Sequence, residues 1–177
     1  MMKATTPQKV FALDLHPLSF GYAVFEGPDE FVDWGIKSFR HGVNAVKVPL
    51  NVKLELLLDK HGPDMVVIKE PRTAALKKLA HTITALAERR RIPVRTISGG
   101  SVRKAFPDEG HNKYQIASLI AKRYPELSPR LGSRRKLWQA ETYSMSIFDA
   151  VALGVTYFMR EATTGHLEDR ALSPLPR

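Results

Sequence analysis

The apolar pattern at the start of the chain predicts three strands. Residues 9–15 form an apolar run typical of a buried strand, and residues 20–27 form a second run after a short turn. Residues 31–39 alternate apolar and polar side chains, which predicts a third strand. Because these segments follow one another closely, we expect an antiparallel meander.

Helices and strands alternate in the next part of the chain. Residues 44–61 have leucines at helical spacing, and Pro49 implies a late start or a kink. Residues 65–70 form a short apolar run typical of a buried strand, residues 73–91 predict a long helix, and residues 92–97 predict a further strand. This alternation predicts that the later strands extend the sheet in parallel.

The last third of the chain predicts two helices joined by a loop. Asn112 is placed to cap a helix that ends near Arg123, and residues 141–160 form a final helix with an apolar stripe. Between them, residues 125–142 contain prolines, a glycine and an Arg-Arg-Lys run. We expect this segment to be a basic loop or insertion.

Length and composition indicate one globular domain. The chain has 177 residues, of which 44% are hydrophobic. We expect the domain to occupy residues 1–161, and the polar residues 162–177 to form a flexible tail. The absence of cysteine excludes disulfides and thiolate metal sites. No apolar run has the length of a membrane span, and no signal-peptide pattern is present, so we expect a soluble cytoplasmic protein.

The charge of the chain is positive and unevenly distributed. The formal net charge is +9, and residues 89–136 hold thirteen Lys and Arg against three Asp and Glu. Nucleic acid is the leading partner for such a field, because each phosphate contact releases condensed counterions. A solubilising surface is the simpler interpretation of the same charge.

Three carboxylates stand next to segments that are expected to be buried. Asp14 follows the first apolar run, Glu70 ends the run at residues 65–70, and Asp149 lies beside the apolar stripe of the final helix. Neighbouring carboxylates repel one another, and a hard divalent cation removes that conflict. Oxygen ligands suit Mg²⁺ or Mn²⁺, and two such ions about 4 Å apart promote phosphodiester hydrolysis. The pattern therefore indicates a nuclease.

Each carboxylate also has a simpler interpretation. Asp14 could be a turn or capping residue, Glu70 could pair with Arg72 on the surface, and Asp149 could face a basic side chain at residues 103–104. Three histidines keep a mixed nitrogen and oxygen site open: His16, His41 and His111. The metal hypothesis depends on the three carboxylates occurring together.

The order of the motifs resembles a known family. The segments FALDLHPLSFGYAVFE, MVVIKEP, AERRRIPVRTISGGSVRKAF, HNKYQIASLIAKRYPEL and SIFDAVALGV follow the motif series of the RuvC-type Holliday-junction resolvases, within the RNase H-like superfamily. The resemblance runs from about Val10 to Phe158 and leaves residues 125–142 unexplained. It implies an α/β fold with a five-stranded mixed sheet, whose first three strands are antiparallel and whose two faces carry helices. It further implies a Mg²⁺-dependent endonuclease, commonly a homodimer, that cuts four-way DNA junctions to leave a 5′-phosphate.

The resemblance also implies roles for individual residues. Asp14 matches the aspartate that bridges both metal ions, Glu70 the glutamate at the end of the fourth strand, and Asp149 the aspartate of the last helix. Lys113 and Arg103 match positions that contact phosphates, and Lys113 is counted among the catalytic residues. Seven basic residues are predicted to bind nucleic acid: Arg72, Arg103, Lys104, Lys113, Arg134, Arg135 and Lys136.

The sequence departs from the family pattern at three places. Ser146 stands where resolvases usually have a second aspartate in the last helix, and Glu141 could substitute for it. Residues 71–73 replace an aromatic that wedges into the junction, and His16 and Leu18 replace small residues. Three aromatic residues are candidates for another wedge: Phe106, Tyr114 and Trp138.

Other functions compete with the resolvase prediction. An RNA-processing nuclease of the YqgF type shares the fold and similar carboxylate motifs. A non-catalytic nucleic-acid-binding module on the same fold would explain the missing fourth carboxylate. The ATP-binding relatives of the superfamily rank lowest, because they need two such domains and 177 residues hold one.

Overall fold

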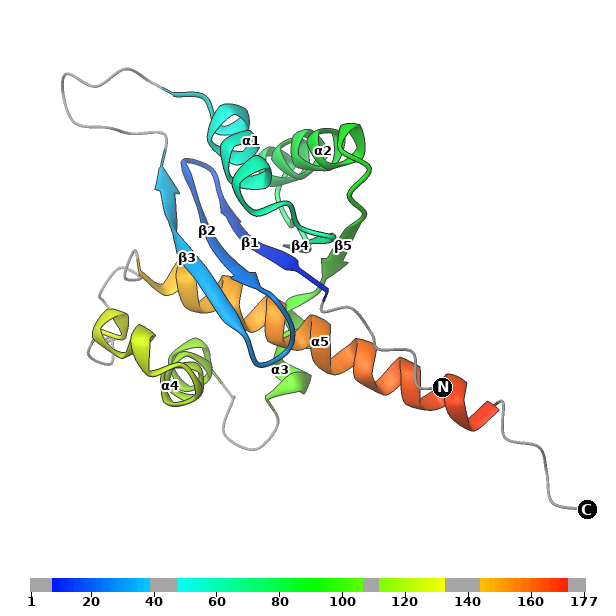
Figure 1. The fold of residues 1–177 in the computed structure, drawn as a ribbon. Coiled ribbons are helices and arrows are strands. Elements are labelled where there is room, and N and C mark those ends of the chain that lie inside the picture. Colours follow the sequence, from blue (N-terminus) through cyan, green and yellow to red (C-terminus); the bar gives the residue numbers. More distant parts are fainter. Residues whose placement is uncertain (1–7, 39–47, 107–111, 133–143, 172–177) are drawn as a thin grey trace, which may run out of the picture.

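A five-stranded mixed sheet forms the centre of the computed structural model, which describes residues 8–38, 48–106, 112–132 and 144–171. The strand order is β3-β2-β1-β4-β5 (Figure 1). The strands are β1 (Val10–His16), β2 (Ser19–Phe25), β3 (Phe31–Ser38), β4 (Met65–Lys69) and β5 (Val94–Ile97). The first three strands pair antiparallel, whereas β4 and β5 extend the sheet in parallel from β1. The predicted fold class is confirmed.

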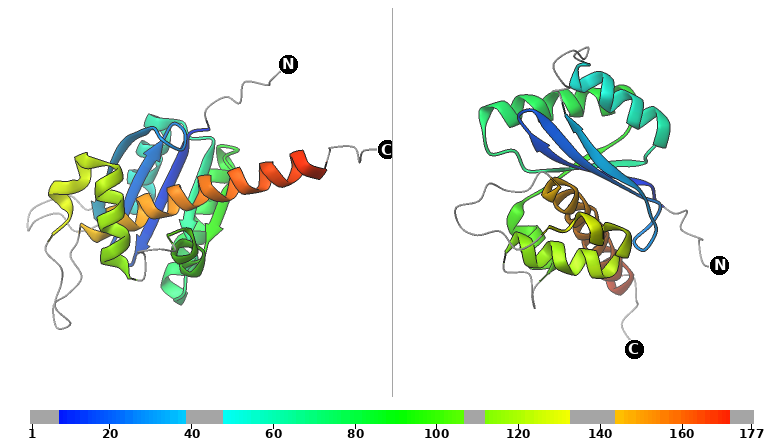
Figure 2. Two further views of the ribbon diagram at one scale, coloured as in Figure 1. Left: turned by 90° about the horizontal axis from the view of Figure 1, so that it is seen from below. Right: turned by 90° about the vertical axis from the view of Figure 1, so that its left-hand side faces the viewer.

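Helices cover both faces of the sheet. The helices are α1 (Leu50–His61), α2 (Ala74–Arg89), α3 (Gly99–Ala105), α4 (Lys113–Arg123) and α5 (Met145–Ala171). Helices α1 and α2 pack on one face, while α5 crosses the other face with α3 and α4 beside it (Figure 2). None of the helices in the described ranges is long and apolar enough to cross a membrane.

Two hydrophobic cores result from the alternation of side chains along β1. Val10 and Ala12 belong to the core under α5, whereas Phe11 and Leu13 belong to the core under α1 and α2. Asp14 is in phase with Val10 and Ala12, so it faces α5. The strand therefore delivers a carboxylate to the interface between the sheet and the last helix.

A glycine in β2 allows α5 to approach the sheet at this point. Gly21 is the β2 partner of Asp14 in the strand register. A Cβ atom on Gly21 would overlap the backbone carbonyl and the hydroxyl of Ser146. Only glycine fits at position 21, because any side chain would overlap Ser146. The first turn of α5 can therefore pack against Asp14.

Most predicted elements are present, with some differences at their ends. Helix α1 begins after Pro49, as that residue implied, and Asn112 caps α4 through a reciprocal capping box with Gln115. Within the predicted loop at 125–142, the 3₁₀ helix η1 spans Pro125–Arg130. Helix α5 continues to Ala171, so it is longer than the sequence pattern predicted.

Candidate functional site

Asp14 is the buried centre of the candidate site. Its residue surface is 2% exposed, and it lies on β1 facing α5. Its Oδ2 atom is 2.7 Å from Nε2 of His16 and accepts a hydrogen bond of 3.0 Å from Oγ of Ser146. Nζ of Lys69 lies 3.8 Å from Oδ1. Three elements, β1, β4 and α5, therefore hold this carboxylate.

Asp149 is the second carboxylate of the site. It follows Ser146 by one turn of α5, and its Oδ2 atom forms a 3.0 Å ion pair with Nζ of Lys113. Burial raises the pKa of Asp149, and the charge of Asp14 raises it further, although Lys113 and Lys69 oppose the shift. The charge of Asp14 thus acts on Asp149, and the two carboxylates share one region.

His16 borders the site from the end of β1. Its side chain is 41% exposed, and its ring nitrogen Nε2 contacts Asp14. The hydrogen bond with Asp14 raises the pKa of His16 above its ordinary value, while burial opposes that rise. Among the histidines predicted for a mixed metal site, His41 and His111 lie outside the described residues.

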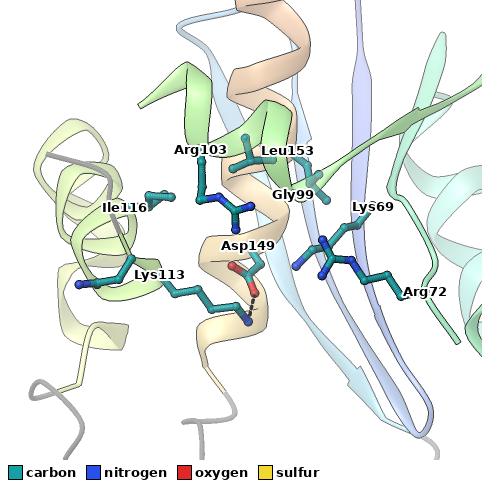
Figure 3. Close-up of a pocket in the computed structure, with 10 residues that line it drawn as sticks. Lys69, Arg72, Gly99, Arg103, Lys113, Ile116, Asp149 and Leu153 are labelled. Carbon is teal, nitrogen blue, oxygen red and sulfur yellow. Dashed lines mark ion pairs between the residues drawn. The ribbon is translucent and has the colours of Figure 1, made fainter. Parts of the chain in front are cut away.

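A basic cavity of about 320 Å³ opens beside Asp149. Figure 3 shows four cationic side chains that line it and come from separate elements: Lys69 from β4, Arg72 from the segment after it, Arg103 from α3 and Lys113 from α4. Arg72 and Arg103 form no ion pair with any other described residue. The cavity therefore has positive charge that the carboxylates of the described residues leave uncompensated, which suits a phosphate group.

Glu70 does not join the two aspartates. It lies one residue beyond β4, is exposed, and donates its backbone N–H to the carbonyl of Ile97 at 2.9 Å. Position 70 is in phase with Val66 and Ile68, which pack in the core on the opposite face of the sheet. The alternative of a surface pair with Arg72 is not formed either, since the ion pairs of the described residues include none between the two.

Lys69 occupies the place that was predicted for the glutamate. The parallel register pairs Leu13 with Ile68, and the next step brings Lys69 beside Asp14. Across the described ranges, no three His, Asp or Glu side chains come together as a group that could hold a metal ion. Of the three predicted metal ligands, the structure brings Asp14 and Asp149 together and leaves Glu70 outside.

The remaining predicted residues fall into three groups. Lys104 is exposed on α3 and does not line the cavity. Phe106 packs against the core and Tyr114 is half-buried, whereas Leu18 at the turn between β1 and β2 is 53% exposed. Five predicted residues lie outside the described ranges: Arg134, Arg135, Lys136, Trp138 and Glu141.

Sequence reasoning missed two residues that shape the site. Lys69 could have been found by counting alternate positions along the two strands, because a strand places every second side chain on one face. Gly21 could have been found only from its partner, since the sequence does not indicate which helix approaches β2. Lys69 places an ammonium group next to Asp14, and Gly21 leaves room for Ser146 beside it.

The arrangement of sheet and helices is similar to that of solved structures. RuvC from Thermus thermophilus matches at 17% identity with a TM-score of 0.60, covering 88% of this chain and 98% of that one. T. thermophilus RuvC in complex with Holliday junction substrate matches at 12% identity with a TM-score of 0.57, covering 88% and 96%. The chain thus shares the fold of RuvC. Neither a family model nor a curated protein sequence matches the chain.

Proposed function

We propose that this chain is a structure-selective endonuclease that acts on branched DNA. The observation that carries the proposal is the pair of carboxylates, Asp14 and Asp149, the second of which lines a cavity together with four cationic side chains. The RuvC fold supports the same function, because one matching structure is a complex of RuvC with a Holliday junction substrate. The net charge of +9 favours a polyanionic partner.

The cationic side chains would bind the DNA backbone. Arg72 and Arg103 reach into the cavity from two elements, and their guanidinium groups can donate paired hydrogen bonds to phosphate oxygens. Lys113 is 47% exposed and 3.0 Å from Asp149, so its ammonium group can approach a phosphate without leaving the site. These contacts fix the position of the strand and do not read its sequence.

The carboxylate pair fits one Mg²⁺ ion better than two. Mg²⁺ keeps several of its waters and is commonly held by one or two carboxylates together with substrate phosphates. Asp14 and Asp149 match that donor set, whereas the described residues supply no third carboxylate for a second ion. When bound, Mg²⁺ or Mn²⁺ would offset negative charge and lower the pKa of a water molecule.

The side chains around the pair orient it. Ser146 and His16 both contact Oδ2 of Asp14, which leaves Oδ1 directed away from them toward Lys69. The hydrogen bond with Asp14 raises the pKa of His16, which favours a proton on the ring next to that carboxylate. Lys113 offsets the charge of Asp149 before DNA arrives.

The proposed active form on a four-way junction is a homodimer. Paired nicking of two symmetric strands requires two active sites, and one chain supplies one Asp14–Asp149 pair. Sedimentation of the protein with junction DNA should therefore give a complex of two chains per junction. A complex with one chain at saturating protein would contradict this part of the proposal.

The test of the function compares substrates and variants. End-labelled four-way junction, linear duplex and structured RNA are incubated with the protein in Mg²⁺ or in EDTA. We expect Mg²⁺-dependent nicks in the junction, and their loss in Asp14→Asn and Asp149→Asn. Glu126→Gln, an exposed carboxylate on η1, is the matched control and should cut normally. Preferred cleavage of RNA would instead support the YqgF-type function.

One observation favours a second candidate function, a non-catalytic module that binds junctions. Lys69 and Ser146 stand beside Asp14, where further carboxylates would be needed for a complete two-ion site. Binding of junction DNA without cleavage by either the native protein or Asp14→Asn would support this function. Cleavage lost in Asp14→Asn would exclude it.

A further inference from the structure

We infer that Lys69 takes the place of a metal ligand from β4, and that its ammonium group limits this site to a single, weakly bound divalent cation. The inference deepens the proposed function and rests on it for its relevance to catalysis. The geometry behind the inference does not depend on DNA cleavage, because the register of β4 alone determines which of its side chains faces Asp14.

The strand register places Lys69 on the face of the site. Ala12 pairs with Val67 in the parallel ladder, and both belong to the core under α5. Two residues further along, Asp14 and Lys69 occupy the corresponding positions, and Nζ of Lys69 is 3.8 Å from Oδ1 of Asp14. A carboxylate at position 69 would therefore point at the same oxygen.

The charge of Lys69 acts on both carboxylates. It forms the ion pair with Asp14, it lines the same cavity as Asp149, and its side chain is 34% exposed. An ammonium group has three donors and no lone pair, so it cannot ligate a cation. It supplies the positive charge that a second metal ion would bring, and it repels such an ion.

Ser146 removes another ligand from the same region. Its hydroxyl donates to Oδ2 of Asp14, which leaves one fewer lone pair on that carboxylate for a cation. With Lys69 near Oδ1, both oxygens of Asp14 already have cationic or hydrogen-bonding neighbours. The protein alone should therefore bind divalent cations weakly, and the substrate phosphate would complete the coordination.

Cation binding without DNA tests the inference. Electron paramagnetic resonance of free Mn²⁺ gives the dissociation constant and the number of bound ions for the native chain and Lys69→Glu. We expect Lys69→Glu to bind Mn²⁺ about tenfold more tightly, because a repelling charge becomes a ligand. The same increase should be absent in Lys69→Glu combined with Asp14→Asn, which removes the partner ligand.

Two further variants separate the alternatives. Lys77→Glu makes the same change of charge at an exposed position on α2, on the other face of the sheet, and should leave Mn²⁺ affinity unchanged. Equal Mn²⁺ affinity of Lys69→Glu and Lys77→Glu would overturn the inference. If Lys69→Glu does not fold, the neutral Lys69→Gln should still bind Mn²⁺ about threefold more tightly, because the repulsion by the ammonium group is removed. An unchanged dissociation constant for Mn²⁺ in Lys69→Gln would also overturn the inference.

The two proposals fail separately in this design. A chain whose Mn²⁺ affinity rises in Lys69→Glu, but which never cuts a junction, retains the inference and contradicts the nuclease function. A chain that cuts junctions while Lys69→Glu leaves Mn²⁺ binding unchanged retains the function and assigns Lys69 to phosphate binding alone.

Discussion

The hydroxyl of Ser146 donates a 3.0 Å hydrogen bond to the carboxylate of Asp14, and 132 residues separate the two in sequence. The contact joins the first turn of α5 to the middle of the sheet, where both residues are buried. It exists because Gly21 leaves room for the helix on the neighbouring strand. The site therefore depends on how closely one helix packs on one strand.

Gly21→Ala should weaken both the fold and the site. The added methyl group overlaps the backbone of Ser146, so α5 must move away from β2. We expect a loss of about 1–3 kcal/mol in the free energy of unfolding, as for other overpacked cores, measured by urea denaturation. Gly100→Ala on α3, where a Cβ atom meets only ordinary contacts, is the control. Equal stability of both variants would contradict this close packing.

Asp149→Asn should stabilise the protein at neutral pH while it removes activity. Burial and the charge of Asp14 raise the pKa of Asp149 in the folded protein, so the folded state holds a proton that the unfolded state has lost. The free energy of unfolding therefore falls as the pH rises from the ordinary pKa of 3.8 through the raised pKa. Asp149→Asn has no titrating carboxyl group at this position, so its free energy of unfolding should not fall over this pH range. Urea denaturation between about pH 4 and pH 8 measures the difference, with the exposed Asp29→Asn as control. A variant less stable than the native chain at pH 7 would show that the pair with Lys113 outweighs burial.

The titration of His16 should depend on Asp14. The hydrogen bond to Asp14 raises the folded pKa above 6.5, so its contribution to stability is complete below 6.5 and is lost as pH rises through the raised value. We expect Asp14→Asn to lower the pKa of His16, as followed by its ring protons in nuclear magnetic resonance. An unchanged titration in Asp14→Asn would mean that the contact carries no charge interaction in solution.

Arg103→Ala should weaken junction binding in a salt-dependent manner. Arg103 lines the cavity and forms no ion pair with the described residues, so its charge is available to a phosphate. Loss of one phosphate contact should reduce the slope of log affinity against log salt by about 1. Fluorescence anisotropy with labelled junction across a salt series measures the slope. Lys77→Ala on α2 should leave the slope unchanged, and an unchanged slope in Arg103→Ala would assign this arginine no phosphate contact.

The sequence predicted the sheet because its signals are local and strong. The apolar runs of β1 and β4 are buried on both faces, and such strands have few other interpretations. The residue type and position of Asn112 predict a helix cap, and its side chain accepts a hydrogen bond from the N–H of Gln115. The longer α5 could be anticipated less well, since polar residues beyond Glu161 continue the helix without a packing signal.

The candidate site was predicted less completely, and the reason is geometric. Asp14 and Asp149 lie together in the structure. The assignment of a strand residue to one face of the sheet, however, reverses when the register is shifted by one residue. Glu70 and Lys69 differ by one position, and the register with β1 decides between them. Pattern alone places a residue near the end of a strand, whereas the pairing of strands determines which side chain meets its partner.

Position 69 also bears on how such a site can change over generations. Lysine and glutamate codons differ at a single nucleotide, so the residue beside Asp14 is one mutational step from a carboxylate. A population carrying this chain can therefore sample stronger and weaker cation sites without altering the scaffold, because the ladder between β1 and β4 is made by the backbone. Dependence on the cation would be an adjustable trait on a fixed fold.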